Sequence, residues 1–177
     1  MSNMICMKSA KKGTATTKYV VDQEVVYPLQ GVGRINSIEE RPFRDKQLLY
    51  YVIYLEVSDM TVMVPVDKAD HVGIRAIVNK KQAHEALQLL SEEYEPVTAD
   101  WKMRYQMNLD LLKKGSVLDI ATVVRALHHR SRIKELPILE RKLYDSALRL
   151  LVDEISSSLK KAKDEVEKLI FSQMEAD

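Results

Sequence analysis

The sequence is poor in the residues that build cross-linked or membrane-embedded proteins. Its 177 residues include a single cysteine, Cys6. One cysteine can form neither an internal disulfide nor a cysteine-rich zinc site, which fits an intracellular protein. No run of about 18 apolar residues occurs, so we expect no membrane span. Residues 1–18 also lack the apolar core of a signal peptide. These absences predict a cytoplasmic location.

Recognisable catalytic and cofactor motifs are lacking as well. Gly31 and Gly33 are not followed by the third glycine of a dinucleotide-binding loop, and no G-x-x-x-x-G-K-[ST] segment or nucleophile elbow occurs. His128 and His129 are adjacent, and adjacent helical residues point about 100° apart, which disfavours a shared metal ion. We therefore predict no metal, no cofactor and no enzymatic activity.

Residues 19–78 carry the pattern of a small antiparallel sheet. The expected strands are Glu24–Tyr27, Val32–Glu40, Leu48–Val57 and Thr61–Val66, with a hairpin loop at Arg41–Lys46. Residues 49–55 are nearly all apolar or aromatic, which favours a central strand buried on both faces. About 50 residues of short antiparallel strands are typical of a Tudor-like or SH3-like β-barrel.

Helical spacing replaces the strand pattern from Asn79 onward. The first helix is expected to end near Pro96, the second to begin after the N-cap Asp100 and end at Gly115, and the third to run from Ser116 to about Arg132. A last long helix begins near Pro137, and its apolar face would hold Leu139, Leu143, Ala147, Leu150 and Leu151. The chain thus predicts an α+β fold: a flexible tail at residues 1–18, a Tudor-like domain at 19–78, and an all-α bundle of about four helices at 79–177.

The net charge of +1 is distributed unevenly along the chain. Residues 102–149 contain 11 basic and 5 acidic residues, a net charge of +6. Residues 80–101 (2 basic, 5 acidic) and 150–177 (4 basic, 7 acidic) each have a net charge of −3. A local positive field attracts anionic partners such as nucleic acid, although a solvated helical surface explains the count equally well.

Three segments in this order resemble one known family. They are VVYPLQGVGRI at residues 25–35, LEVSDMTVMVPVD at 55–67 followed by HVGIR at 71–75, and WKMRYQMNL at 101–109, which is similar to the family pattern W-x-x-R-Y-x-x-N-L. Over residues 20–165 the chain resembles the CarD/CdnL family of bacterial RNA polymerase-binding regulators. Its N-terminal part also resembles the polymerase-interaction domain of transcription-repair coupling factors.

The resemblance implies that the N-terminal domain binds the β subunit of RNA polymerase. In the family, the arginine that corresponds to Arg41 contacts a lobe of this subunit, and a sheet edge pairs with the same lobe. The implied polymerase-binding residues are Arg41, Phe43, Thr61, Val62, Met63 and Val64. Many members carry arginine at the position of Met63, so one charged contact is in doubt while backbone pairing stays possible. Phe43 could instead cover the edge of the barrel.

The resemblance also implies binding to promoter DNA. In the family, a tryptophan at the position of Trp101 wedges into the minor groove at the upstream edge of the transcription bubble. With the basic block, this nominates Trp101, Lys102, Arg104, Lys113, Lys114, Arg125, Arg130 and Arg132 as DNA-binding residues. The implied protein is a nucleoid-associated monomer that stabilises the open complex without reading a sequence.

Two other interpretations stay open at the level of the sequence. Helical spacing alone places Trp101 on one face with Tyr105 and Leu109, which favours burial of the indole in a protein-only interaction module. Alternatively, the chain is a sequence-tolerant architectural DNA-binding protein that does not need polymerase.

Overall fold

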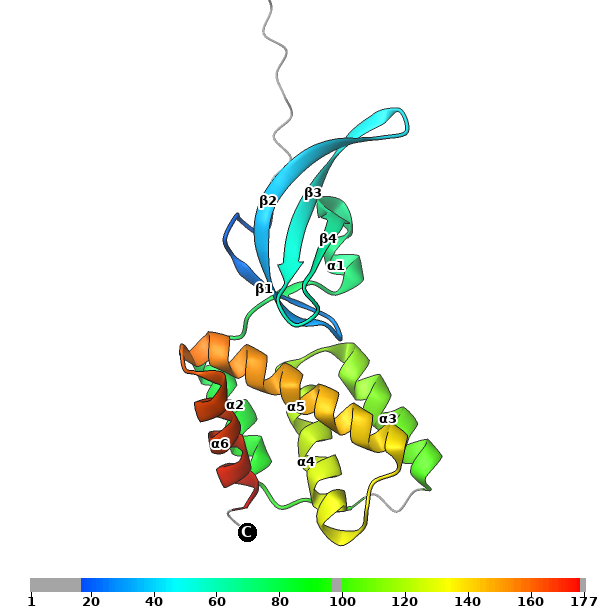
Figure 1. Ribbon diagram of the computed structural model, residues 1–177, viewed down its shortest axis with the longest axis vertical. Helices are drawn as coiled ribbons and strands as arrows, with labels where there is room; N and C mark the ends of the chain where they lie inside the picture. Colours follow the sequence, from blue (N-terminus) through cyan, green and yellow to red (C-terminus); the bar gives the residue numbers. More distant parts are fainter. Residues whose placement is uncertain (1–16, 97–99, 176–177) are drawn as a thin grey trace, which may run out of the picture.

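The computed structural model describes residues 17–96 and 100–175, so most of the predicted tail lies outside the described residues. A sheet domain precedes a helical domain (Figure 1). The strands are β1 (Glu24–Tyr27), β2 (Gly31–Phe43), β3 (Lys46–Leu55), β4 (Met60–Pro65) and β5 (Arg75–Ala76). The helices are the 3-10 turn η1 (Val66–Lys68), α1 (Ala69–Val72), α2 (Lys80–Leu90), α3 (Trp101–Lys114), α4 (Val117–Ile133), α5 (Ile138–Leu159) and α6 (Lys163–Met174).

The five strands form one antiparallel sheet in the order β4-β3-β2-β1-β5. The predicted α+β class is confirmed, although the sheet stays open between its edge strands β4 and β5 and is not a closed barrel. Sequence analysis did not predict β5, because two residues are too few to show a strand period. This short strand pairs with β1 through Arg75 and Ala76.

The β2–β3 hairpin is longer and its turn is shorter than predicted. Residues 41–46, expected to form a loop, pair across the hairpin as far as Phe43 and Lys46. Arg44 adopts a left-handed conformation with φ 54°, which closes the turn in two residues. Pro42 is tolerated inside β2 because β1 pairs with β2 only up to Arg34, so this part of β2 has a strand neighbour on one side.

One face of the sheet forms the core of the domain. Tyr51, Ile53 and Leu55 of β3 are fully buried, whereas Tyr50, Val52 and Tyr54 stay partly exposed. The prediction that β3 is buried on both faces is therefore wrong. Its run of aromatic and β-branched residues reflects strand propensity on a half-buried surface. The hydroxyl of Tyr51 accepts hydrogen bonds from the backbone N–H groups of Lys18 and Tyr19.

In the described part of residues 79–177, five helices, α2 to α6, pack around an apolar core of their own. Helix α2 ends at Leu90, earlier than predicted, and Lys160 (φ 57°) separates α5 from α6. Leu139, expected on the apolar face of the last helix, is 47% exposed. It lies in the first turn of α5, where that helix begins outside the core. Among the residues described, no helix has the length and apolarity that a membrane crossing requires.

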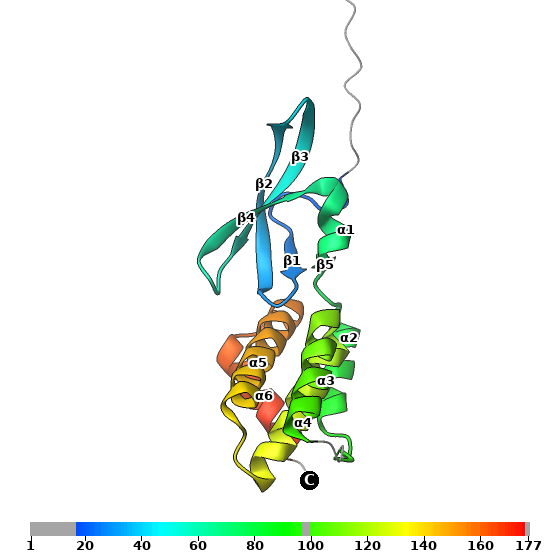
Figure 2. The same cartoon turned by 90° about the vertical axis from the view of Figure 1, so that its right-hand side faces the viewer.

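Helix α5 of the helical domain packs against the sheet domain. In Figures 1 and 2 it runs beneath the sheet, and its later half contacts the strands. Arg75 of β5 forms an ion pair with Glu154 of α5 and donates two further hydrogen bonds to the carbonyl of Gly115. The hydroxyl of Ser157 donates to Glu24 of β1. These contacts place the β2–β3 turn and the start of α3 toward opposite ends of the long axis (Figure 1).

Candidate polymerase and DNA interfaces

Strand register brings four of the predicted polymerase-binding residues onto one face of the sheet. Thr61 lies opposite Tyr54 and Met63 lies opposite Val52, while Arg41 lies opposite Leu48. Because side chains alternate along a strand, these residues face away from buried Tyr51 and Ile53. The outer face is defined here by Arg41, Phe43, Leu48, Tyr50, Val52, Tyr54, Thr61 and Met63.

The end of the outer face toward the hairpin turn is exposed and charged. Phe43 is 52% exposed, and the guanidinium of Arg44 lies 5.5 Å from the centroid of its ring. Arg41 lies 2.7 Å from a carboxylate oxygen of Glu39, and the Arg41 hydrogen bond lowers the pKa of that carboxyl group. Both partners are exposed, so this ion pair contributes little to stability and can exchange for a partner's carboxylate.

Strand β4 is an edge of the sheet, as the β-augmentation prediction requires. Of its four nominated residues, Val64 is buried in the core of the domain and Val62 packs against that core. Their side chains are therefore occupied, and these two positions offer a partner only their backbone groups. Thr61 and Met63 offer side chains, and the absence of a charge at Met63 leaves an apolar contact there.

Trp101 begins α3 and lies outside the helical core. Asp100 caps the helix through its carboxylate, which accepts hydrogen bonds from the N–H groups of Lys102 and Met103. The tryptophan is 41% exposed, and the ammonium group of Lys102 lies 5.8 Å from its ring centroid. Tyr105, one turn later, packs against the core. Helical spacing therefore predicts burial correctly for Tyr105 but not for Trp101.

Arg104 faces the protein interior. Its guanidinium forms two hydrogen bonds with Glu140 of α5, Nε to Oε1 at 2.8 Å and Nη2 to Oε2 at 2.9 Å. The glutamate side chain is fully buried and that of Arg104 is 14% exposed. The hydrogen bond with Glu140 raises the pKa of Arg104, so the guanidinium stays protonated.

The other nominated basic residues divide into inward and outward groups. Arg125 donates to the carbonyl oxygen of Leu89 at 2.8 Å and lies 3.6 Å from the carboxylate of Glu92, so it ties α4 to the end of α2.

The outward group comprises three exposed residues, Lys113, Lys114 and Arg132, and the partly exposed Arg130. The two lysines end α3 next to Gly115, which has φ 76°. They lie at the opposite end of α3 from Trp101, so the predicted set does not form one compact site.

Sequence analysis missed the exposure of apolar residues on the first turns of α3 and α5. Met103 follows it on α3 and is 58% exposed, while Ile138 and Leu139 begin α5, whose first turn is joined to α3 by the Arg104–Glu140 pair. Together, Trp101, Met103, Ile138 and Leu139 are called the apolar tip. Helical spacing predicted a core position for Leu139 and made no prediction for Met103 or Ile138, so only the placement of α5 against α3 could have identified this group.

The histidine pair has separate neighbours. His128 Nδ1 lies 3.1 Å from the hydroxyl of Tyr144, while the ring of His129 packs against Tyr94 with centroids 5.2 Å apart. Burial lowers the pKa of His128 and raises that of Tyr144 to about 12, so both are neutral at pH 7. In the described parts of the chain, no three histidine, cysteine or acidic residues are grouped so that they could hold a metal ion.

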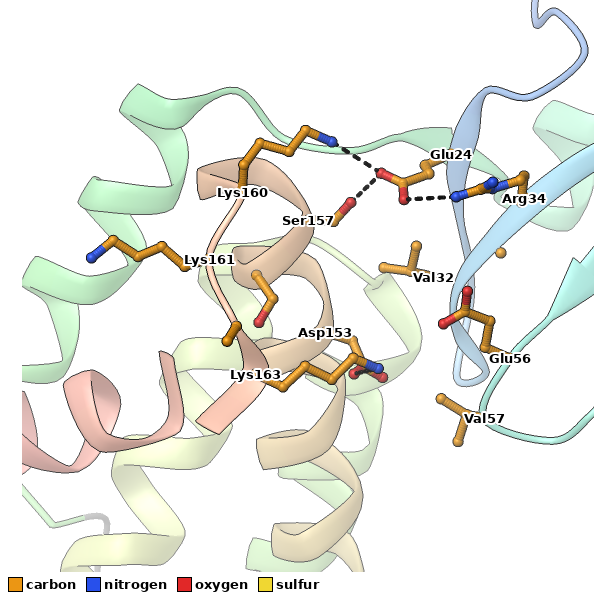
Figure 3. A pocket seen from close by; sticks show the side chains of 13 residues that line it. Glu24, Val32, Arg34, Glu56, Val57, Asp153, Ser157, Lys160, Lys161 and Lys163 are labelled. Carbon is orange, nitrogen blue, oxygen red and sulfur yellow. Dashed lines mark hydrogen bonds and ion pairs between the residues drawn. The ribbon is translucent and has the colours of Figure 1, made fainter. Parts of the chain in front are cut away.

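A crevice of about 430 Å³ lies between the sheet and the helices beside α5 (Figure 3). Figure 3 shows Ser157, Lys160 and Arg34 directed toward the carboxylate of Glu24, which lines the crevice. The hydrogen bond from Ser157 lowers the pKa of Glu24, and the charge of Lys160 lowers it further. Lys163 pairs with Asp153 at 2.8 Å on the same wall. The crevice is thus lined by ion pairs, including ones that join the domains.

Comparison with known proteins identifies both domains. The CarD-like/TRCF RID domain model matches residues 19–78, and the model of the CarD C-terminal domain matches residues 85–171. The putative transcription factor YdeB of Bacillus subtilis (strain 168) is 32% identical over 137 residues, which cover 77% of this chain and 90% of YdeB.

A solved structure matches part of the chain. The solution structure of the 72-residue N-terminal domain of Myxococcus xanthus CarD is 30% identical, covers 39% of this chain and 92% of that domain, and has a TM-score of 0.30. The two family models match the sheet domain and then the helical domain, and the match to YdeB covers most of the chain. The chain therefore belongs to the CarD family of transcription regulators.

Proposed function

We propose that this protein is a non-enzymatic regulator of transcription initiation that holds RNA polymerase with its sheet domain and melted promoter DNA with its apolar tip. The observation that carries the proposal is the exposure of Trp101 at the start of α3, outside the helical core. A 41% exposed indole beside a lysine is suited to an unstacked base step flanked by phosphates.

The polymerase contact is assigned to the outer face and the edge of β4. An edge strand offers a row of unpaired backbone groups to a strand of the β subunit, and the outer face adds Arg41, Phe43 and Met63 as side-chain contacts. The match to the CarD-like/TRCF RID domain over residues 19–78 supports this assignment.

The DNA contact is assigned to Trp101, Lys102 and the outward basic residues Lys113, Lys114, Arg130 and Arg132. Exposed lysines and arginines neutralise phosphates and fix the orientation of the protein on DNA, without sequence information. The effect on initiation follows if the indole binds melted DNA more tightly than duplex DNA, because equal affinity for both states would shift no equilibrium.

The proposal is tested by the lifetime of the open complex with polymerase and protein present. Trp101→Phe keeps most of the apolar area but removes the width of the indole and its N–H donor. We expect a shorter open-complex lifetime with little change in the free energy of unfolding. Leu118→Ala is the matched control, since Leu118 is also 41% exposed but lies at the start of α4. An unchanged lifetime with Trp101→Phe and with Trp101→Ala would refute the wedge.

An architectural DNA-binding protein that acts without polymerase is the alternative, and a polymerase pull-down with the full chain separates the two. Arg41→Glu reverses a charge on the outer face and should weaken capture of polymerase without unfolding the protein. Arg141→Glu, an exposed reversal on α5, is the charge-matched control. Failure of the wild-type chain to capture polymerase would favour the alternative.

A further inference from the structure

A buried ion pair ties the first turn of α3 to the first turn of α5. Both hydrogen bonds between Arg104 and Glu140 have ordinary lengths of 2.8 and 2.9 Å and run from one planar guanidinium to one carboxylate. Such a bidentate contact fixes orientation as well as distance. Arg104 lies one helical turn after Trp101, so the two residues share a side of α3.

We propose that Arg104 is a positioning residue for Trp101: it holds the start of α3 against α5 through Glu140, so that the indole keeps one orientation toward melted DNA. This inference rests on the proposed function, since it concerns how the same wedge is held. It replaces the role that sequence resemblance assigned to Arg104, which was a contact with DNA.

Burial decides between these two roles. To reach a phosphate, the guanidinium would have to leave Glu140, whose side chain is fully buried. An unpaired buried carboxylate is strongly unfavourable, because water cannot solvate the charge that remains. Lys102, the exposed neighbour of Trp101, can reach a phosphate without that cost. The arginine therefore orients the turn, and the lysine is available to the DNA.

The two roles predict opposite effects of removing the charge of Glu140. Electrostatics alone predicts that the loss of a negative charge from a DNA-binding domain tightens DNA binding. If the pair positions Trp101, Glu140→Gln should instead loosen the indole, weaken the hold on DNA that contains a melted segment, and shorten the open-complex lifetime severalfold. Glu135→Gln is the matched control, because it removes an exposed negative charge just before α5.

Fluorescence gives a readout that is independent of DNA. The chain contains one tryptophan, so its emission reports on Trp101 alone. Glu140→Gln and Arg104→Gln should both lower the anisotropy of this emission and increase its quenching by acrylamide, while Glu135→Gln should change neither. The double variant Arg104→Gln/Glu140→Gln leaves no unpaired charge and keeps the protein testable if a single variant unfolds. It should show the same mobile indole.

The dependence of DNA affinity on salt separates positioning from phosphate contact. If Arg104 contacted a phosphate, Arg104→Gln alone would make the slope of log affinity against log salt less steep by about 0.9, and Glu140→Gln would leave it unchanged. We expect Arg104→Gln and Glu140→Gln to change the DNA affinity and its salt slope alike, and the double variant to lose no more DNA affinity than either single variant.

The outcomes distinguish a failure of the positioning role of Arg104 from a failure of the Trp101 wedge. Tighter DNA binding by Glu140→Gln, or unchanged indole anisotropy in all three variants, would overturn the positioning role. An unchanged open-complex lifetime with both Trp101→Phe and Trp101→Ala would refute the wedge itself. In that case the quenching comparison still shows whether the pair orients Trp101.

Discussion

At the scale of single residues, both backbone conformation and steric room decide which positions require glycine. Gly31 has φ 92° and does need the left-handed region that glycine allows. Gly33 does not have a positive φ. Its constraint is the close approach of β3, since an added Cβ would lie 2.8 Å from both Ile53 Cγ2 and Leu55 Cδ2. The two glycines of the same motif are thus required for different physical reasons.

Gly33→Ala should therefore destabilise the sheet domain through overpacking. We expect a loss of about 1–3 kcal/mol in the free energy of unfolding, measured by denaturant titration. Leu55→Val trims one of the side chains that the new methyl group meets. The double variant Gly33→Ala/Leu55→Val should consequently lose less than the sum of the two single losses. Simple additivity would show that the collision does not cause the loss.

At the scale of secondary-structure elements, cap residues set where the helices begin and end. The sequence correctly predicted Asp100 and Ser116 as N-caps and Gly115 as the left-handed residue after α3. It missed the capping box at Asn79 and Gln82. Caps are predictable because they act through N–H groups two or three residues away, which needs no tertiary information.

Asp100 should make the stability of α3 depend on pH. The N–H group of Met103, followed by that of Lys102, lowers the pKa of Asp100 below its ordinary value of 3.8. A carboxyl group with a lowered folded-state pKa stabilises the fold fully above pH 3.8 and loses this contribution as pH falls through the folded-state value. Asp100→Ala should therefore reduce stability at pH 7 and have a smaller effect at the acid limit.

Asp100→Asn is the matched control for the cap, since asparagine also accepts the two N–H groups but carries no charge. The difference in unfolding free energy between Asp100→Asn and Asp100→Ala should not vary across the acid range. If it varied as much as the difference between wild type and Asp100→Ala, titration of Asp100 would not be the cause.

At the scale of the whole molecule, α5 fixes the relation between the two domains. Arg75 is 29% exposed and Glu154 is 2% exposed, and the carboxylate also accepts from the N–H of Val78 at 3.3 Å. Glu24 of β1 adds a second contact with α5, through Ser157 (Figure 3). These polar contacts fix the distance between the outer face and the apolar tip. The proposed function needs this fixed distance, because one molecule must contact polymerase with the outer face and DNA with the apolar tip.

Arg75→Met should destabilise the whole protein, because it leaves Glu154 buried without its counter-charge. We expect a loss of about 3–5 kcal/mol in the free energy of unfolding. Arg75→Met/Glu154→Leu removes both charges and should recover much of that loss, yet small-angle scattering should show a broader range of domain orientations. Equal losses in the single and double variants would mean that the ion pair does not join the domains.

The amino-acid sequence by itself determined the elements and the family. Strand and helix periods, caps and turn residues act over a few neighbours, so they predicted β1, β4, the start of α3 and the α+β class. The three motifs also placed the chain in its family.

Tertiary structure alone decided which charges and apolar residues are available. Arg104 and Lys102 are indistinguishable in a count of basic residues, but Glu140, 36 positions later in the chain, turns Arg104 inward. Leu139 was predicted as a core position, yet the start of α5 exposes both Leu139 and Ile138 next to the turn that carries Trp101. The physical reason is that burial and ion pairing depend on contacts between distant segments, whereas helical and strand periods record only local geometry.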